Sequence, residues 1–124
     1  MQIEVSNSEI VDKFTILKIK ELKITDPEKL KNIKKEIELL QPAIDKIGIS
    51  EDSEQYLRLI MINSDLWKVE DEIREHEKLK RFDDNFISLA RSAYTLNDKR
   101  SIIKKEINIL TGSSLIEEKN HDLS

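Results

Sequence analysis

The sequence predicts an all-α, four-helix arrangement in which a short N-terminal helix pair packs on a long antiparallel helical hairpin. Only two Gly and two Pro occur among the 124 residues, so the helices are expected to be long. A helical pattern runs from about Ser53 to Thr111 and breaks once, at residues 81–85. Because so short a connection makes the two long helices antiparallel neighbours, we expect this hairpin within a single helical domain over residues 1–112. A polar C-terminal tail follows over residues 113–124.

The N-terminal segment is expected to be a short extended arm followed by the first helix. Residues 2–5 alternate polar and apolar side chains with the period of a strand. The chain offers no second strand, so any pairing would be with the same arm of another subunit. Ser6 and Glu9 have the spacing of a capping box and start a helix over about 7–24. The apolar face of this helix is Ile10, Phe14, Leu17 and Ile24, with Val11 and Ile16 beside them.

The second helix is expected over about 27–47. Asp26 is a good N-cap, and Pro27 suits the first helical position, where its missing N–H is not needed. Pro42 should kink or end the helix, because it removes a hydrogen-bond donor and crowds the carbonyl four residues earlier. Gly48 should stop the last turn. The stripe that faces the core is Leu30, Ile33, Ile37, Leu40 and Ile44.

The third helix, over about 52–80, changes character along its length. Its N-cap comes from residues 50–53. Residues 56–62 are apolar nearly all round, which predicts that this part is enclosed on more than one side. The second half is highly charged and keeps a narrow apolar seam, as in a two-helix coiled coil. The stripe consists of Leu59, Ile62, Leu66, Val69 and Ile73.

The fourth helix, over about 84–111, completes the hairpin. Asp83 or Asp84 caps its start and Gly112 ends it. Folding it back places Val69 near Leu96 and aligns the apolar stripes. The long helices span roughly 40 Å at 1.5 Å per residue and the short ones roughly 25 to 30 Å, so the short pair covers only the root of the hairpin. We therefore expect a homodimer that covers the remaining apolar surface.

The composition argues against several classes of protein. The net charge of −4 lacks the basic field that attracts phosphate, so we expect no nucleic-acid partner and no membrane partner. The absence of cysteine excludes disulfides, thiolate metal sites and cysteine nucleophiles. The sequence contains neither a signal-peptide pattern nor a run of about 20 apolar residues, so we expect a cytoplasmic location.

One polar belt between the long helices is a candidate ligand site. Arg100 interrupts the apolar seam of the fourth helix and is expected near Asn63 and Trp67. Arginine offers a planar fork for carboxylate or phosphate, and bundles bind such ligands between helices. Alternatively, Arg100 pairs with Glu70 or with its own chain and fixes the helix register. The candidate ligand-binding residues are Asn63, Trp67, Glu70, Arg91, Asn97 and Arg100, and Asp12, Lys13 and Thr15 could border the belt.

Other residue patterns carry no predicted chemistry. Glu72 and Glu75 have the ExxE spacing of the magnesium motif in all-α nucleotide pyrophosphohydrolases, but the second acidic pair that this chemistry needs is missing from the facing helix. His76 and His121 lie far apart and lack the spacing of a zinc site. The sequence contains no phosphate-binding loop and no nucleophile motif. We therefore predict no catalytic residue, no metal site and no cofactor.

Whole segments of the chain resemble a known family. Residues 3–17, residues 90–100 and the segment Glu117-Glu118-Lys119 are similar to a family of short, uncharacterised bacterial and phage proteins, and the resemblance spans nearly the whole chain. This resemblance implies a compact helical protein of unknown function and carries over no catalytic residue. A looser similarity to the helical chorismate mutases rests on architecture alone.

Two functions are therefore expected from the sequence. The first is a non-enzymatic helical module that self-associates or binds a protein partner. The alternative is a small all-α enzyme or binding protein that recognises an anionic metabolite in the polar belt.

Overall fold

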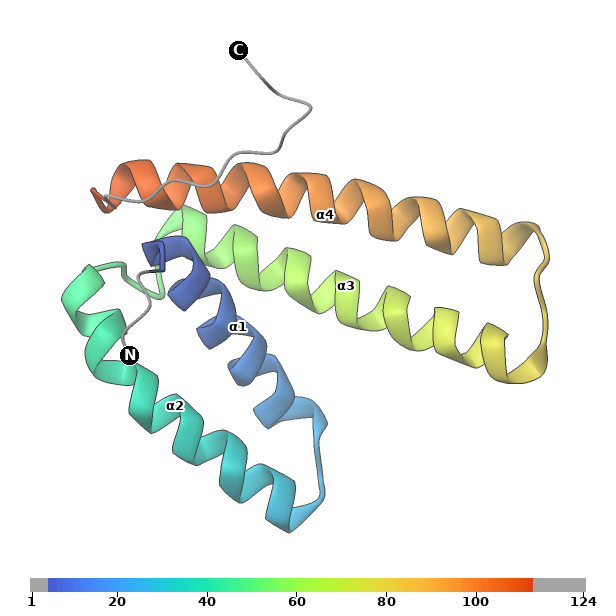
Figure 1. Ribbon diagram of the computed structural model, residues 1–124, viewed down its shortest axis with the longest axis horizontal. Helices are drawn as coiled ribbons and strands as arrows, with labels where there is room; N and C mark the ends of the chain where they lie inside the picture. Colours follow the sequence, from blue (N-terminus) through green and yellow to red (C-terminus); the bar gives the residue numbers. More distant parts are fainter. Residues whose placement is uncertain (1–4, 113–124) are drawn as a thin grey trace.

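The computed structural model describes residues 5–112 and consists of four helices (Figure 1). These are α1 (Asn7–Lys23), α2 (Pro27–Ile47), α3 (Glu54–Leu79) and α4 (Asp84–Leu110). Residues 5–112 contain no strand, which confirms the all-α class. Each helix begins and ends within two residues of its predicted boundary. Most of the predicted N-terminal arm and the whole predicted tail, residues 113–124, lie outside the described residues, and the extent of the domain stays a prediction.

The helix starts follow from local sequence. Ser6, Asp26, Ser53 and Asp83 are the four N-caps, and each side chain accepts a hydrogen bond from the backbone N–H three residues later, over 3.0 to 3.4 Å. Such caps satisfy donors that the first helical turn leaves free. The capping residues recognised in the sequence therefore determine where each helix begins.

The helix ends are less uniform. Gly48 and Gly112 take positive φ angles of 79° and 70° after α2 and α4, as expected of glycine beyond a helix. The end of α3 is different, because Lys80 adopts a left-handed conformation with φ of 53°. Two hydrogen bonds hold it there, from Lys80 N–H to the Glu77 carbonyl and from Arg81 N–H to the His76 carbonyl. The turn into α4 is thus made without glycine.

The central element of the packing is α1. It packs against α2 on one side and against α3 and α4 on the other, while α3 and α4 run antiparallel beside each other (Figure 1). One core joins all four helices. Its buried apolar residues are Val11, Phe14, Leu17, Ile33, Ile37, Ile44, Ile49, Tyr56, Leu59, Ile103 and Ile107.

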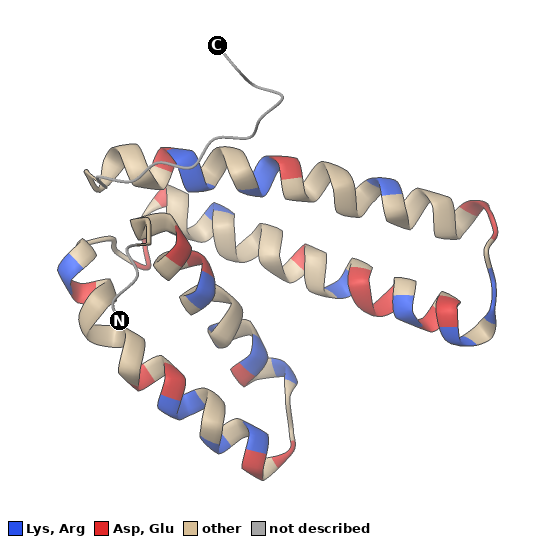
Figure 2. Cartoon of the chain, in the orientation of Figure 1, with Lys and Arg blue, Asp and Glu red and all other residues tan. Residues whose placement is uncertain are grey.

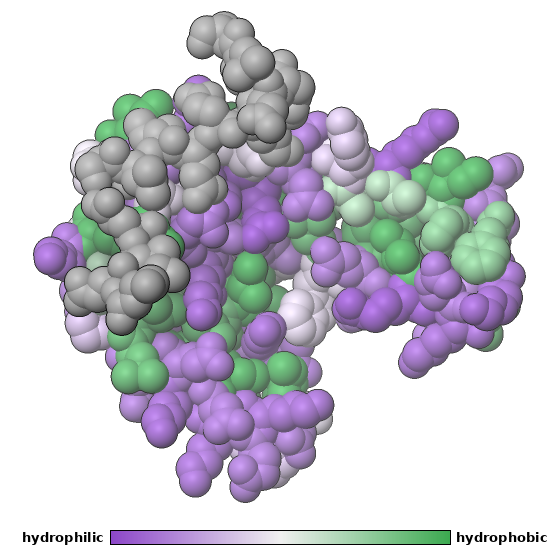
Figure 3. Space-filling model, in the orientation of Figure 1, coloured by the Kyte–Doolittle hydropathy of each residue, from purple (hydrophilic) through white to green (hydrophobic). Residues whose placement is uncertain are grey.

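The short helix pair covers only the root of the hairpin, as predicted. Leu66 is the last buried apolar residue on α3, and Ile103 is the first on α4 within the described chain. Within residues 5–112, the distal part of the hairpin, beyond these two positions, is a pair of helices without further cover (Figure 1). Hydrophobic surface is accordingly visible over this part of the molecule in Figure 3.

One expectation about the helices needs correction, and one alternative is decided. Pro42 is expected to kink or end the second helix; it does not end it, since α2 continues through it to Ile47, the predicted boundary. Pro42 and Glu38 are both exposed, so the Glu38 carbonyl that loses its donor can bond to water. The turn over residues 56–62 is only partly enclosed, because Leu57 and Met61 are 48% and 65% exposed. In a single chain, one side of this turn faces solvent.

Candidate functional site

The most prominent polar feature is a buried aspartate between α1 and the hairpin. Asp12 is 4% exposed. Its Oδ1 accepts hydrogen bonds from Asn63 Nδ2 at 2.9 Å and from Arg100 Nε at 3.0 Å, and its Oδ2 accepts a second bond from the Arg100 guanidinium. A bidentate arginine–carboxylate pair is strongly directional. Asp12 therefore ties α1 to both α3 and α4 in one geometry.

Thr15 closes this arrangement from the side of α1. Its hydroxyl donates to the Asp12 carbonyl at 2.7 Å and accepts from Asn63 Nδ2 at 2.9 Å. The amide of Asn63 is consequently held by two acceptors on α1. The hydrogen bond with Asp12 raises the pKa of Arg100 above its ordinary value; burial opposes the shift, and Glu9 and Glu70 add attraction. Arg100 is thus a permanent cation with its partner already in place.

Further polar contacts follow the same two helices. Lys104 forms an ion pair with Glu9. Backbone N–H of Ser8 donates to Asn108 Oδ1 at 2.9 Å, and Asn7 Nδ2 donates to Thr111 Oγ1 at 3.0 Å. Along this row of contacts the residue numbers rise on α1 and fall on α4, so the two helices run antiparallel. We call this row, from Asn7–Thr111 to Asp12–Arg100, the polar seam.

The polar seam is closed to further partners. Every buried side-chain nitrogen or oxygen in the described part of the chain has a hydrogen-bond partner. Buried polar groups that are already satisfied gain little by binding a ligand and would lose a bond in doing so. The polar seam is therefore best interpreted as a structural lock between α1 and the hairpin.

The structure brings together some of the six predicted ligand-binding residues. Asn63 and Arg100 meet at Asp12, and Asn97 Oδ1 lies 3.4 Å from Arg100 Nη1 as an acceptor. Trp67 is half-buried, and no polar contact joins it to this group. Arg91 is exposed and lies elsewhere on the hairpin, as described below.

The sequence left open whether Arg100 pairs with Glu70 or with its own chain, and the structure shows that it pairs with Asp12 of its own chain. Glu70 is exposed, and its carboxylate acts on Arg100 only as a distant charge. It lies seven residues beyond Asn63, roughly 10 Å further along α3. Asp12 takes its place because α1 crosses the hairpin at the level of Asn63 and Arg100.

Sequence reasoning placed Asp12 and Thr15 only at the border of the site. A signal for their role was present in the sequence. Ser8, Asp12 and Thr15 repeat at spacings of four and three, which puts them on one face of a helix, and all three are buried. A matching polar row occurs on α4 at Arg100, Lys104, Asn108 and Thr111. Two polar stripes that both repeat every three or four residues predict a polar contact between their helices.

His76 has a structural role at the tip of the hairpin. It is 9% exposed, and its Nδ1 lies 2.9 Å from the Glu72 carbonyl while its Nε2 lies 3.2 Å from Asn85 Nδ2. The Asp83 carboxylate is 3.6 Å from Nε2, and the Phe86 ring packs nearby. Within residues 5–112, no group of three or more His, Cys, Asp or Glu side chains could hold a metal ion.

A small hollow also lies between α1 and α2. Its volume is about 450 Å³, and its lining includes Ile16, Leu40 and the exposed Lys13. Its two carboxylates from α1, Glu9 and Asp12, are already paired with Lys104 and Arg100. The polar-seam residues that line this hollow are therefore not free to bind a ligand.

A larger feature lies on the side of the hairpin turned away from α1. Asp65 and Ile102 come two residues after Asn63 and Arg100, so they are rotated by about 200° from the residues that face α1. Two connected hollows of about 550 and 360 Å³ occupy this side and share Asp65, Leu96 and Lys99 in their linings. We call them together the α3–α4 groove.

The floor of the α3–α4 groove is apolar. It is formed by the partly buried Ile62, Val69 and Leu96 and by the buried Ile103. Val69 and Leu96 line one hollow and Ile62 and Ile103 line the other, which agrees with the predicted register of the hairpin. The groove is therefore the open side of the α3–α4 seam.

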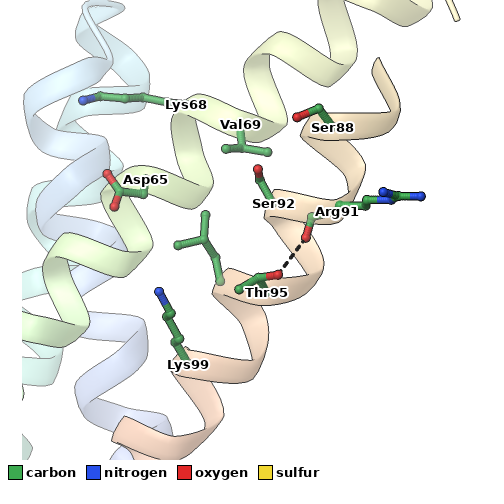
Figure 4. Close-up of a pocket in the computed structure, with 9 residues that line it drawn as sticks. Asp65, Lys68, Val69, Ser88, Arg91, Ser92, Thr95 and Lys99 are labelled. Atoms are coloured by element: carbon green, nitrogen blue, oxygen red, sulfur yellow. Dashed lines mark hydrogen bonds between the residues drawn. The ribbon is translucent and has the colours of Figure 1, made fainter. Parts of the chain in front are cut away.

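Charged and hydroxyl side chains border the groove. Lys68, Arg91 and Lys99 form no ion pair within residues 5–112. Figure 4 shows Lys68 and Arg91 extending in opposite directions, away from the floor. The Thr95 hydroxyl donates to the Arg91 carbonyl at 3.1 Å. The cations are thus spread along the groove and do not converge on one point.

These features define the class of protein: an all-α protein with a closed polar seam and an open groove along a helical hairpin. The chain matches the family of unknown function DUF6165 over residues 1–124 and belongs to that family. Comparison with curated proteins and with solved structures yields no match. No helix within residues 5–112 is long and apolar enough to cross a membrane.

Proposed function

We propose that this protein is a non-enzymatic helical interaction module that docks a partner helix in the α3–α4 groove. One observation carries the proposal: the apolar floor of the groove continues into exposed apolar side chains on both rims. Met61 on α3 is 65% exposed and Ile102 on α4 is 59% exposed. A contiguous exposed apolar surface with polar borders is typical of a protein interaction site.

The dimensions of the groove support a helical partner. From Arg58 to Val69 the α3 side extends over roughly 16 Å, and from Ser88 to Ile103 the α4 side extends over roughly 22 Å at 1.5 Å per residue. A helix of about four turns has this length and can lay an apolar stripe along such a groove. A compact metabolite would leave most of the floor uncovered.

The alternative is a protein that binds an anionic metabolite. Its support is the set of three cations, Lys68, Arg91 and Lys99, beside the hydroxyls of Ser88 and Ser92. These cations are exposed and splayed, and Arg100 of the predicted belt is already bound to Asp12. A ligand held by scattered surface lysines is bound weakly. We therefore place this function second.

The proposal includes the setting expected from the sequence. We propose that the module acts in the cytoplasm and that it is of bacterial or phage origin, as the resemblance of its segments implies. The coiled-coil character of the distal hairpin belongs to the same proposal and is supported by the narrow seam of α3 and α4.

Site-directed photo-crosslinking tests the proposed function. A photoreactive residue at Met61 or Ile102 should give adducts of one defined higher mass in living cells, and in purified protein as well if the partner is a second copy of the chain. The matched control is Leu39 on α2, which is apolar and 71% exposed but lies outside the groove. Adducts at Leu39 and none at Met61 or Ile102 would refute docking in the groove. A thermal-shift screen with phosphates and carboxylates tests the alternative, since a ligand that binds the native state raises the melting temperature.

A further inference from the structure

We propose that the occupant of the α3–α4 groove is a second copy of this chain, packed groove to groove with the twofold axis running along the hairpin. In this arrangement α3 of one subunit lies over α4 of its partner, and the two hairpins form a four-helix bundle. The inference rests on the proposed function, because it requires the groove to be a docking surface.

The level of each residue along the hairpin follows from contacts within one chain. Arg58 on α3 forms an ion pair with Glu106 on α4 at 3.2 Å, so these two positions lie at the same level. One heptad further along, Asp65 on α3 and Lys99 on α4 line the same two hollows. Between these levels, Met61 and Ile102 line one hollow together.

Rotation about a twofold axis parallel to the hairpin places each residue of α3 opposite the residue of α4 of the partner subunit that lies at the same level. Asp65 then faces Lys99 of the partner subunit, and Lys99 faces Asp65 of the partner subunit. At the next levels Met61 meets Ile102 of the partner subunit, and Arg58 meets Glu106 of the partner subunit. Each of these four charged residues meets the opposite charge, and the exposed Met61 and Ile102 meet each other. Such self-complementarity is what an isologous interface requires.

When the same faces pair about a perpendicular twofold axis, the match depends on the level of that axis. A twofold axis perpendicular to the hairpin at the level of Asp65 lays α3 over α3. Asp65 would then face Asp65 of the partner subunit, and Lys99 would face Lys99 of the partner subunit. Like charges placed directly opposite each other disfavour an interface. A perpendicular axis at the level of Met61 would instead place Asp65 opposite Arg58 of the partner subunit and Lys99 opposite Glu106 of the partner subunit. Recombined charge variants separate the two axes, because only the axis along the hairpin lets the one-to-one mixture and the double variant dimerise.

The apolar surface gives the reason for pairing at all. Apart from His76, no residue on the distal part of the hairpin is buried between Leu66 on α3 and Ile103 on α4. Four-helix bundles bury such seams by packing two hairpins face to face. Charges are concentrated on the distal half of α3, whereas the distal half of α4 carries few (Figure 2). Laying α3 over α4 of the partner subunit therefore keeps the two charged α3 segments, one from each subunit, apart from each other.

Exchange of the rim charges tests this inference. Asp65 and Lys99 form no ion pair within residues 5–112, so Asp65→Lys and Lys99→Asp should leave the fold of each subunit intact. Sedimentation equilibrium should give a dimer for the wild type, twice the chain mass of 14.5 kDa. Each single variant should dimerise about tenfold more weakly or worse, because two attractive contacts become repulsive.

The decisive experiment mixes the two single variants, or combines both substitutions in one chain. One single variant carries lysine at both rim positions and the other carries aspartate at both, so a one-to-one mixture should form a heterodimer in which opposite charges meet. The double variant should dimerise like the wild type. Lys34→Asp on the exposed face of α2 changes the net charge as much as Lys99→Asp and should leave the dimer unchanged.

Two results would overturn this inference: a wild type that is monomeric at about 100 μM, a concentration at which a dissociation constant in the micromolar range gives mostly dimer, or single variants that dimerise normally. If a monomeric wild type still gives Met61 adducts with another protein, the proposed function stands and the second copy is excluded.

Discussion

The buried pair of Asp12 and Arg100 gives the sharpest test of the structure. The side chain of Asp12 is 5% exposed and that of Arg100 is 28% exposed. Arg100→Met leaves the Asp12 carboxylate buried with Asn63 as its remaining side-chain donor, so we expect a loss of about 3 to 5 kcal/mol in the free energy of unfolding. Asp12→Leu leaves Arg100 able to reach water, and we expect a smaller loss of about 1 to 3 kcal/mol.

The double variant separates the value of the pair from the cost of breaking it. Asp12→Leu with Arg100→Met should unfold within about 1 kcal/mol of the wild type, because a buried ion pair replaced by apolar packing is often neutral. Asn63 keeps Thr15 as an acceptor in this variant. Denaturant unfolding of all four proteins, at one protein concentration and with comparable m-values, completes the cycle.

Two outcomes would refute the reasoning. If Arg100→Met costs less than about 1 kcal/mol, Asp12 is not the buried partner that the structure indicates. If the double variant loses as much as the two single variants together, the residues act independently. Glu70→Gln is the matched control, and it should change stability by no more than about 0.5 kcal/mol because Glu70 is exposed.

Four further substitutions or titrations test other parts of the structure. Ile103→Ala should cost about 2 to 5 kcal/mol by denaturant unfolding, because Ile103 is 1% exposed in the core. Glu72→Ala should change stability by no more than about 0.5 kcal/mol, since its side chain lies on a solvated face. Lys80→Gly should stabilise the chain by about 0.5 to 1 kcal/mol, because glycine accepts the φ of 53° without strain. Burial raises the pKa of Tyr56 to about 12, so absorbance titration of a Tyr94→Phe variant should show Tyr56 ionising well above its ordinary value of 10.0. Stability should consequently fall as pH rises from about 10 towards about 12, and a Tyr56 that ionises near its ordinary pKa would contradict its burial.

Local rules account for most of the secondary structure. The four N-caps and the two glycines beyond helix ends are recognisable without any knowledge of packing, because a cap acts within three or four residues of itself. The apolar stripe of α2 likewise identified its core face, since Ile33, Ile37 and Ile44 are all buried. The short pair on a longer hairpin followed from helix lengths and the short connection alone.

Local rules leave the outcome open where solvent decides it. Pro42 does not end α2, because the carbonyl it deprives of a donor faces water. Whether a given carbonyl faces water depends on which side of the helix the rest of the protein covers. Exposure of Leu57 and Met61 is decided in the same way, since Tyr56, Leu59 and Asn63 on the covered side of the same turns are buried.

The candidate site depended still more on tertiary structure. Asn63 and Arg100 were found from the sequence because both lie on the hairpin, whose register follows from one short connection. Asp12, the residue that joins them, is 88 positions away from Arg100 in the chain. Its place depends on the angle at which α1 crosses the hairpin, and helix periodicity does not contain that angle. The sequence thus determined the helices, their boundaries and their apolar faces through short-range interactions, whereas the packing of α1 decided which polar groups are closed off and which side of the hairpin stays open.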